Sequence, residues 1–166
     1  MNKKIIMRIT LWCCVATIMA IVFMFSNQPA DISSETSSSV IEKIASVFIR
    51  DYNDLTMKSK ETIVSGMQNF VRKTAHFTIY CVLGVFTISA MLTYVMRYRR
   101  RVLTATAICL AYAASDEFHQ MFISGRSCQF SDVCLDFCGS ILGIAIVSLI
   151  FYIGLKRKHK LKAGTN

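Results

Sequence analysis

The stretch VLTATAICLAYAASDEFHQMFI, residues 102–123, decides how many helices of this chain cross a membrane. Its uncharged part, residues 102–114, would form a helix of about 20 Å, too short for a hydrocarbon core of roughly 30 Å. A crossing helix must therefore continue through Asp116 and Glu117, with Gly125 as its natural stop. Glu117 then lies about 23 Å from the inner end of the helix, where an unpartnered carboxylate is costly. We therefore expect both carboxylates to meet partners inside a bundle.

Three further apolar runs flank this stretch, at residues 5–25, 77–96 and 137–155. Because 54% of the 166 residues are hydrophobic, the core is expected to lie largely in lipid. We predict an all-α integral membrane protein, a single-domain bundle of four transmembrane helices over residues 1–166. The spans are expected at about 5–25, 76–96, 102–123 and 133–155. The first is interpreted as a retained signal anchor, because it is long for a signal peptide and lacks a small-x-small cleavage site.

The basic residues predict the orientation of this bundle. Twelve of the 19 lie in three segments that hold no acidic residue, whereas residues 26–75 and 116–136 hold all ten acidic ones. Excess Lys and Arg mark cytoplasmic segments, so both termini are predicted to be cytoplasmic. The net charge of +9 then reflects topology and contact with anionic lipid, which argues against a nucleic-acid partner. The twelve are Lys3, Lys4, Arg8, Arg97, Arg99, Arg100, Arg101, Lys156, Arg157, Lys158, Lys160 and Lys162.

Residues 26–75 form a predicted outer segment between the first two spans. The Ser-rich residues 26–39 are expected to be a loop, and Ser39 with Glu42 fits a capping box that starts a short amphipathic helix. Residues 51–56 break that helix, and a second amphipathic stretch leads into the second span. We interpret the segment as a structural lid in preference to a substrate-binding loop.

The seven cysteines give no sign of a metal site or of redox chemistry. They show no CxxC or Cys/His zinc spacing. A disulfide between Cys128 and either Cys134 or Cys138 is open, but the odd total and the apolar setting favour free thiols.

Polar residues recur at helical spacing on the second and fourth spans. Arg72, His76 and Tyr80 follow i, i+4, i+8 and share one face, with Lys73 beside them. Asp132 and Asp136 precede a GxxxG pair, Gly139 and Gly143, which permits close helix packing and turns that face inward.

These stripes are expected to converge with the third span on one pocket at the outer leaflet. The polar groups exceed what packing requires, so we interpret the pocket as functional rather than as ion pairs that merely hold the bundle together. Its candidate residues are Arg72, Lys73, His76, Tyr80, Asp116, Glu117, His119, Gln120, Arg126, Asp132 and Asp136.

The same residues resemble a known family. Asp116-Glu117-Phe118-His119-Gln120, Gly125-Arg126, Asp132-Val133, Asp136, Gly139 and Gly143 are similar to motifs of the VanZ-like bacterial membrane proteins, as are Arg72-Lys73-x-Ala75-His76-x3-Tyr80 and Phe25-Ser26-x-Gln28. The similarity covers about residues 20–145. It implies a multi-pass protein of the bacterial cell envelope and a link to resistance against the glycopeptide teicoplanin. Relatives commonly carry Asn at Asp136 and Ala at Ser140.

Three functions are compatible with the sequence. The first is binding or remodelling of an anionic lipid, a lipid-linked cell-wall precursor or a lipoglycopeptide, with Arg72, Lys73 and Arg126 receiving phosphate or carboxylate groups. The second is a membrane-embedded enzyme that uses Glu117, His119 and Asp116 as acid–base groups for hydrolysis or transfer on a lipid head group. The third is a proton-coupled transporter, which would need a homo-oligomer. His76, His119, Glu117 and Asp132 are suitable metal ligands, but without HExxH spacing we assign no metal and no other cofactor.

Overall fold

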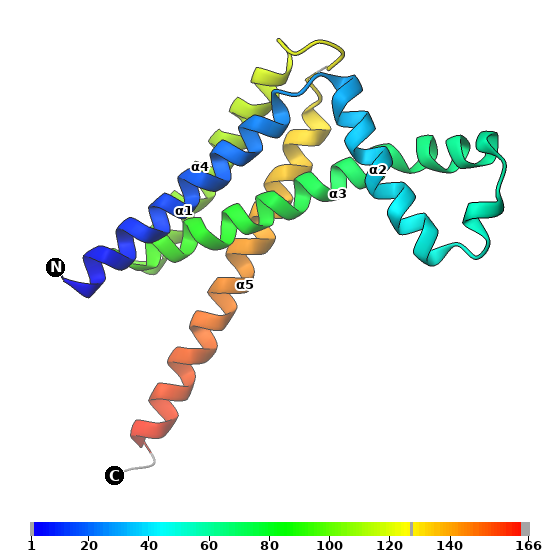
Figure 1. Ribbon diagram of the computed structural model, residues 1–166. Coiled ribbons are helices and arrows are strands. Elements are labelled where there is room, and N and C mark those ends of the chain that lie inside the picture. Colours follow the sequence, from blue (N-terminus) through cyan, green and yellow to red (C-terminus); the bar gives the residue numbers. More distant parts are fainter. Residues whose placement is uncertain (1, 127, 164–166) are drawn as a thin grey trace.

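The computed structural model describes the backbone of residues 2–126 and 128–163, and their side chains except those of residues 30–32 and 158–163. This part of the chain contains five α-helices and one short 3-10 helix, and no strand. The predicted all-α fold is therefore confirmed. The elements are α1 (Lys3–Ser26), α2 (Ala30–Phe48), η1 (Tyr52–Asp54), α3 (Met57–Leu92), α4 (Tyr98–Gln120) and α5 (Phe130–Ala163) (Figure 1).

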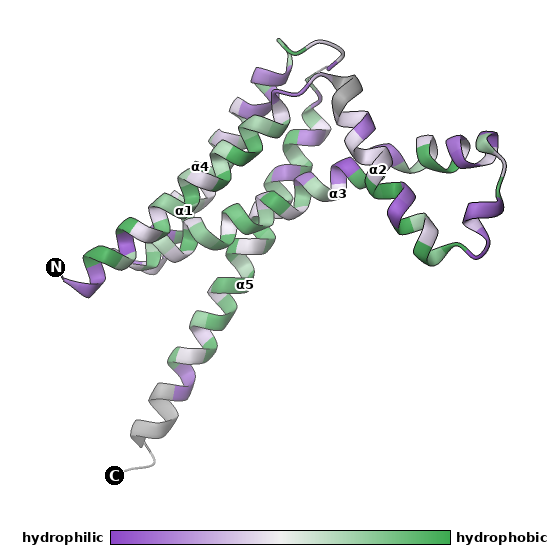
Figure 2. Ribbon diagram, in the orientation of Figure 1, coloured by the Kyte–Doolittle hydropathy of each residue, from purple (hydrophilic) through white to green (hydrophobic). Residues whose placement is uncertain are grey.

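Three helices, α1, α3 and α5, are long and apolar enough to cross a membrane. Apolar residues cover most of α1, the second half of α3 and the middle of α5 (Figure 2). These helices indicate a multi-pass membrane protein. The 23 residues of α4 would span about 34 Å, which is long enough to cross a membrane. Its charged residues, and not its length, distinguish it from the three apolar helices. The fourth crossing therefore stays a prediction.

Helices α1 and α4 lie side by side and run in the same direction (Figure 1). The Tyr112 hydroxyl donates to the carbonyl of Met19 at 2.5 Å, in the middle of both helices. Where the two helices end, the Ser26 hydroxyl donates to Asp116 Oδ2 at 2.8 Å. The third predicted span is thus tied to the first along its length.

The start of α1 and the late part of α5 each contact residues at or next to the α3–α4 turn. Arg8 donates to the Thr93 hydroxyl at 3.2 Å and to its carbonyl at 3.0 Å. Tyr98 stacks on Phe151 with ring centroids 5.9 Å apart. The basic segments of the α1 start and the α3–α4 turn therefore share one end of the bundle, and Lys156 and Arg157 follow Phe151 on α5. Asp116 lies at the opposite end.

Glycines bring α3 and α5 into backbone contact where they cross. A methyl group added at Gly143 would overlap the carbonyl of Cys81, and one added at Gly139 would overlap that of Phe77. The predicted inward face of the GxxxG pair is confirmed. Because these glycines let the two backbones touch, they also set the depth at which Asp136, on the same stripe, faces α3.

The loop predicted for residues 26–39 is wrong, because α2 already begins at Ala30 after Pro29. The serines are accommodated inside the helix: the hydroxyls of Ser37, Ser38 and Ser39 each donate to the carbonyl four residues earlier. Ser39 is therefore a mid-helix residue and not the cap of a capping box. The break at residues 51–56 is confirmed, as η1 lies there.

The predicted span limits also differ from the helix ends. The chain turns after Leu92 rather than after Met96, and α3 is a single 36-residue helix that includes the second amphipathic stretch. Helix α4 ends at Gln120, three residues before the predicted Ile123, and Gly125 takes a φ of 74° in the turn that follows. Helix α5 runs past the predicted limits of 133 and 155, from Phe130 to Ala163.

Candidate functional site

A buried polar cluster lies where α1 and α4 end. Asp116 is 3% exposed, Glu117 2% and Gln120 7%. The Gln120 amide donates to the Ser26 hydroxyl and to Asp116 Oδ2, both at 3.3 Å. The buried Ser26 thus links the end of α1 to the third predicted span. It gives the buried Asp116 carboxylate a hydrogen-bond donor, which a buried polar group requires.

Adjacent carboxylates on α4 turn toward different helices. Asp116 faces α1 through Ser26. Glu117 Oε2 instead accepts the backbone N–H of Gln129 at 3.1 Å, just before α5 begins. A carboxylate at that position interacts favourably with the positive end of the α5 dipole and fixes where α5 begins.

Helices α3 and α5 contribute His76, Tyr80 and Asp136 to the same region. His76 Nδ1 lies 3.6 Å from Asp136 Oδ2, and Asp136 is 1% exposed. Tyr80 is completely buried. The predicted stripes therefore do meet inside the bundle.

The three basic candidates differ in how far they are neutralised. Lys73 Nζ lies 2.6 Å from Asp132 Oδ1 in an ion pair. Arg72 donates to the Asn69 amide oxygen and Arg126 to the carbonyl of Phe25, each at 3.3 Å. Within the described part of the chain, neither arginine forms an ion pair with a carboxylate. Burial and the neighbouring charge of Arg72 lower the pKa of the Arg126 guanidinium from its usual value, although Asp116 and Glu117 oppose this.

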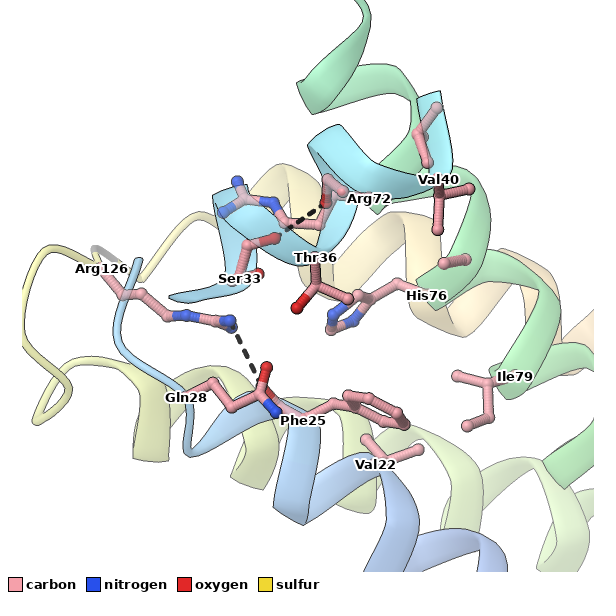
Figure 3. A pocket seen from close by; sticks show the side chains of 13 residues that line it. Val22, Phe25, Gln28, Ser33, Thr36, Val40, Arg72, His76, Ile79 and Arg126 are labelled. Carbon is pink, nitrogen blue, oxygen red and sulfur yellow. Dashed lines mark hydrogen bonds between the residues drawn. The ribbon is translucent and has the colours of Figure 1, made fainter. Parts of the chain in front are cut away.

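A cavity of about 240 Å³ opens between the end of α1, helix α2 and the middle of α3. Its wall is mostly apolar, with Val22, Phe25, Val40 and Ile79 among the contributors. Arg126 reaches it from the turn after α4, whereas Arg72 and His76 come from α3, as Figure 3 shows. None of the described residues that line it is acidic. The cavity therefore combines a mostly apolar wall with two arginines that form no ion pair with the described carboxylates.

A second, smaller cavity of about 20 Å³ adjoins the first. Arg72, His76 and Arg126 line both cavities. The smaller one also reaches Lys73, Glu117, Gln120, Asp132 and Asp136. Eight of the eleven predicted site residues thus line one of the two cavities.

The remaining three, Tyr80, His119 and Asp116, have different surroundings. Tyr80 lies deeper, with its ring centroid 6.0 Å from that of Tyr112. The His119 ring stacks on Phe23 at 4.7 Å and lies 3.4 Å from the Asn27 amide oxygen. It lines neither cavity, and no contact with Glu117 or Asp116 is found among the described residues.

Asp116 lines neither cavity but contacts a residue that does. It reaches Gln120 directly, and Gln120 lines the smaller cavity.

Several site residues were not identified from the sequence. Ser33, Thr36 and Val40 of α2 form one wall of the larger cavity (Figure 3), but most of this stretch was interpreted as a loop. Gln28 also lines it. Helical spacing of Ser33, Thr36 and Val40 was the available signal, and the serine content obscured it.

The cysteine prediction holds. All seven cysteines are free, and Cys128, Cys134 and Cys138 are exposed.

Comparison with known proteins supports the resemblance noted from the motifs. Residues 11–152 match the model of the family described as VanZ/LLP1. Among curated proteins and among solved structures, none matches the chain.

Proposed function

The chain belongs to the VanZ/LLP1 family, and we propose that it binds the anionic head group of a lipid, or of a lipid-linked cell-wall precursor, at the outer leaflet of the bacterial cytoplasmic membrane. We further propose that binding or remodelling of such a molecule lowers the susceptibility of the cell to teicoplanin.

The proposed topology has four crossings with both termini in the cytoplasm. Helix α4 runs beside the apolar α1 and carries its carboxylates at the end opposite Arg8. Partners from α1 and α5 receive those carboxylates, which lowers the cost of placing α4 in the membrane. The basic segments at the other end then face the cytoplasm. The cavities accordingly lie toward the outer leaflet.

One observation carries the proposed ligand class: two arginines that pair with no carboxylate among the described side chains share a cavity with a mostly apolar wall. Guanidinium groups bind phosphate and carboxylate through paired N–H donors. Their mutual repulsion is relieved when an anion lies between them. Val22, Phe25 and Ile79 offer contact to an acyl or prenyl chain. An amphiphile with an anionic head matches both parts of the cavity.

The enzyme alternative receives less support from the geometry. His119, its expected base, lines neither cavity and stacks on Phe23. Glu117 is engaged by the N–H of Gln129. The positions of both groups are therefore explained by structural contacts, without a catalytic role.

The proposal predicts selective retention of anionic lipid by the two arginines. In native mass spectrometry of the detergent-solubilised protein, phosphatidylglycerol should bind and phosphatidylcholine should not compete with it. One charge-assisted hydrogen bond contributes about 1.5–3 kcal/mol. Arg72→Gln or Arg126→Gln should therefore weaken phosphatidylglycerol binding roughly tenfold to a hundredfold.

Arg50→Gln is the matched control, because Arg50 is an exposed arginine of the same outer segment that lines neither cavity. It should leave binding unchanged. The proposal fails if both lipids are retained equally, or if Arg50→Gln weakens binding as much as the cavity variants do. Melting temperatures measured without lipid identify any variant that has lost its fold.

A further inference from the structure

Three side chains from three helices, two of them buried, bring metal-binding atoms together beside the polar cavity. They are His76 of α3, Asp116 of α4 and Asp136 of α5. One ligand atom from each lies within 4.8 Å of those of the other two. An ion with bonds of about 2.0–2.2 Å to nitrogen and oxygen holds its donors at most about 4.4 Å apart, so small side-chain shifts would bring these three atoms onto one ion.

Three of the four carboxylate oxygens in this cluster have no hydrogen bond among the described residues. Asp116 is 3% exposed and Asp136 1%. Among the described residues, Asp116 Oδ1 and both oxygens of Asp136 accept no hydrogen bond. The hydroxyl of the fully buried Tyr80 is also without a partner. Buried carboxylates are normally paired, hydrogen-bonded or bound to a metal.

Nearby cations do not supply the missing charge. Lys73 is paired with Asp132. Arg72 and Arg126 donate to Asn69 and to the carbonyl of Phe25, and neither reaches Asp116 or Asp136. Even a protonated His76, 3.6 Å from Asp136, would balance only one of the two carboxylates.

We propose that His76, Asp116 and Asp136 bind one divalent transition-metal ion, Zn²⁺ or Mn²⁺. A set of one imidazole nitrogen and two carboxylate oxygens suits these borderline ions better than Mg²⁺ or Ca²⁺, which prefer oxygen alone. The ion would balance both carboxylates and give their free oxygens a partner. The cavity of about 20 Å³, lined by His76 and Asp136, has room for about one water molecule as a further ligand.

This metal site departs from the expectation drawn from the sequence, which assigned no metal. The residues considered there were His76, His119, Glu117 and Asp132, and only His76 belongs to the cluster. No local spacing reveals the set, because its three members come from three helices. The inference does not depend on lipid binding.

The test measures metal binding to the detergent-solubilised protein without added lipid. After treatment with EDTA, the full chain is titrated with Zn²⁺ or Mn²⁺, exchanged into metal-free buffer and analysed for bound metal. The wild type should retain one ion per chain and gain thermal stability. Asp136→Asn and His76→Gln should each weaken binding at least about tenfold. In the Mn²⁺ form, pulsed EPR should show coupling to an imidazole nitrogen that His76→Gln removes.

Two nearby variants are matched controls. Asp132→Asn removes a carboxylate that lines the same small cavity but lies outside the cluster, and His119→Gln removes a histidine of the same end of the bundle. Both should retain the ion. The inference is overturned if the wild type retains no metal, or if its Mn²⁺ shows no nitrogen coupling. It is also overturned if Asp136→Asn stabilises the protein without any metal dependence, which would show that the two carboxylates share a proton instead. The wild-type measurements need no variant to fold.

Discussion

After Ser124→Cys in a chain whose seven native cysteines have been replaced, the new thiol should react almost completely with a membrane-impermeant maleimide on intact cells. After Val95→Cys it should not react. Ser124 is exposed in the turn after α4, and Val95 is fully exposed in the turn before it. If α4 crosses the membrane, these turns lie on opposite sides, and only the outer one meets the reagent.

Asn53→Cys places a second exposed probe beyond α1, in η1, and should label like Ser124→Cys. A membrane-permeant maleimide should label all three positions, which shows that Val95→Cys is accessible in principle. Equal labelling of the two turns that flank α4 would show that α4 does not cross. Labelling of Val95→Cys alone would reverse the orientation and place the cavities at the inner leaflet.

Expression of the chain in a susceptible Gram-positive host should raise the inhibitory concentration of teicoplanin by several doubling dilutions and leave that of vancomycin nearly unchanged. Teicoplanin carries a fatty acyl chain, which holds it at the outer leaflet, whereas vancomycin lacks one. A protein that binds anionic amphiphiles at that level acts where the acylated drug and its lipid-linked target lie. Dilution assays with both drugs measure the difference.

The Arg72→Gln/Arg126→Gln double variant should abolish this protection at equal abundance in the membrane, and Arg50→Gln should preserve it. Both arginines line the larger cavity, whereas Arg50 does not. Equal protection against both drugs would indicate a change in the peptide target instead. Absence of protection, with the wild type present in the membrane, would exclude resistance as the role of this chain.

The helices that carry long apolar runs could be predicted from the sequence, but only the second half of α2 could. Hydropathy and length identify α1, α3 and α5 because lipid imposes one simple requirement on all three. In α2, serines that disfavour helices in water donate back to carbonyls of their own helix and pack against α3, as the 2.7 Å bond from Gln68 to Ser38 shows. Such compensation depends on the tertiary fold, which local propensity does not contain.

The candidate site could be predicted as a set of residues but not as a set of contacts. Helical spacing correctly placed His76 and Asp136 on facing stripes, because the backbone period is fixed. It could not tell that Asp116 turns to α1 and Glu117 to α5, since neighbours on a helix point about 100° apart and either can face the interior. His119 follows the same helix but lies against Phe23.

Photocrosslinking from within the larger cavity tests most directly whether an anionic amphiphile binds there. Phe25 lines that cavity and is half-exposed, so a benzophenone-bearing amino acid can replace it; Phe122, exposed and outside both cavities, is the matched control position. After irradiation of intact cells, mass spectrometry of the purified protein identifies the attached lipids. The probe at position 25 should capture phosphate-bearing anionic lipid in excess of its share of the membrane, and Arg72→Gln/Arg126→Gln should remove that excess. The probe at position 122 should sample the bulk lipids. The same bulk mixture at both positions, unchanged by loss of the two arginines, would contradict an anion-binding cavity.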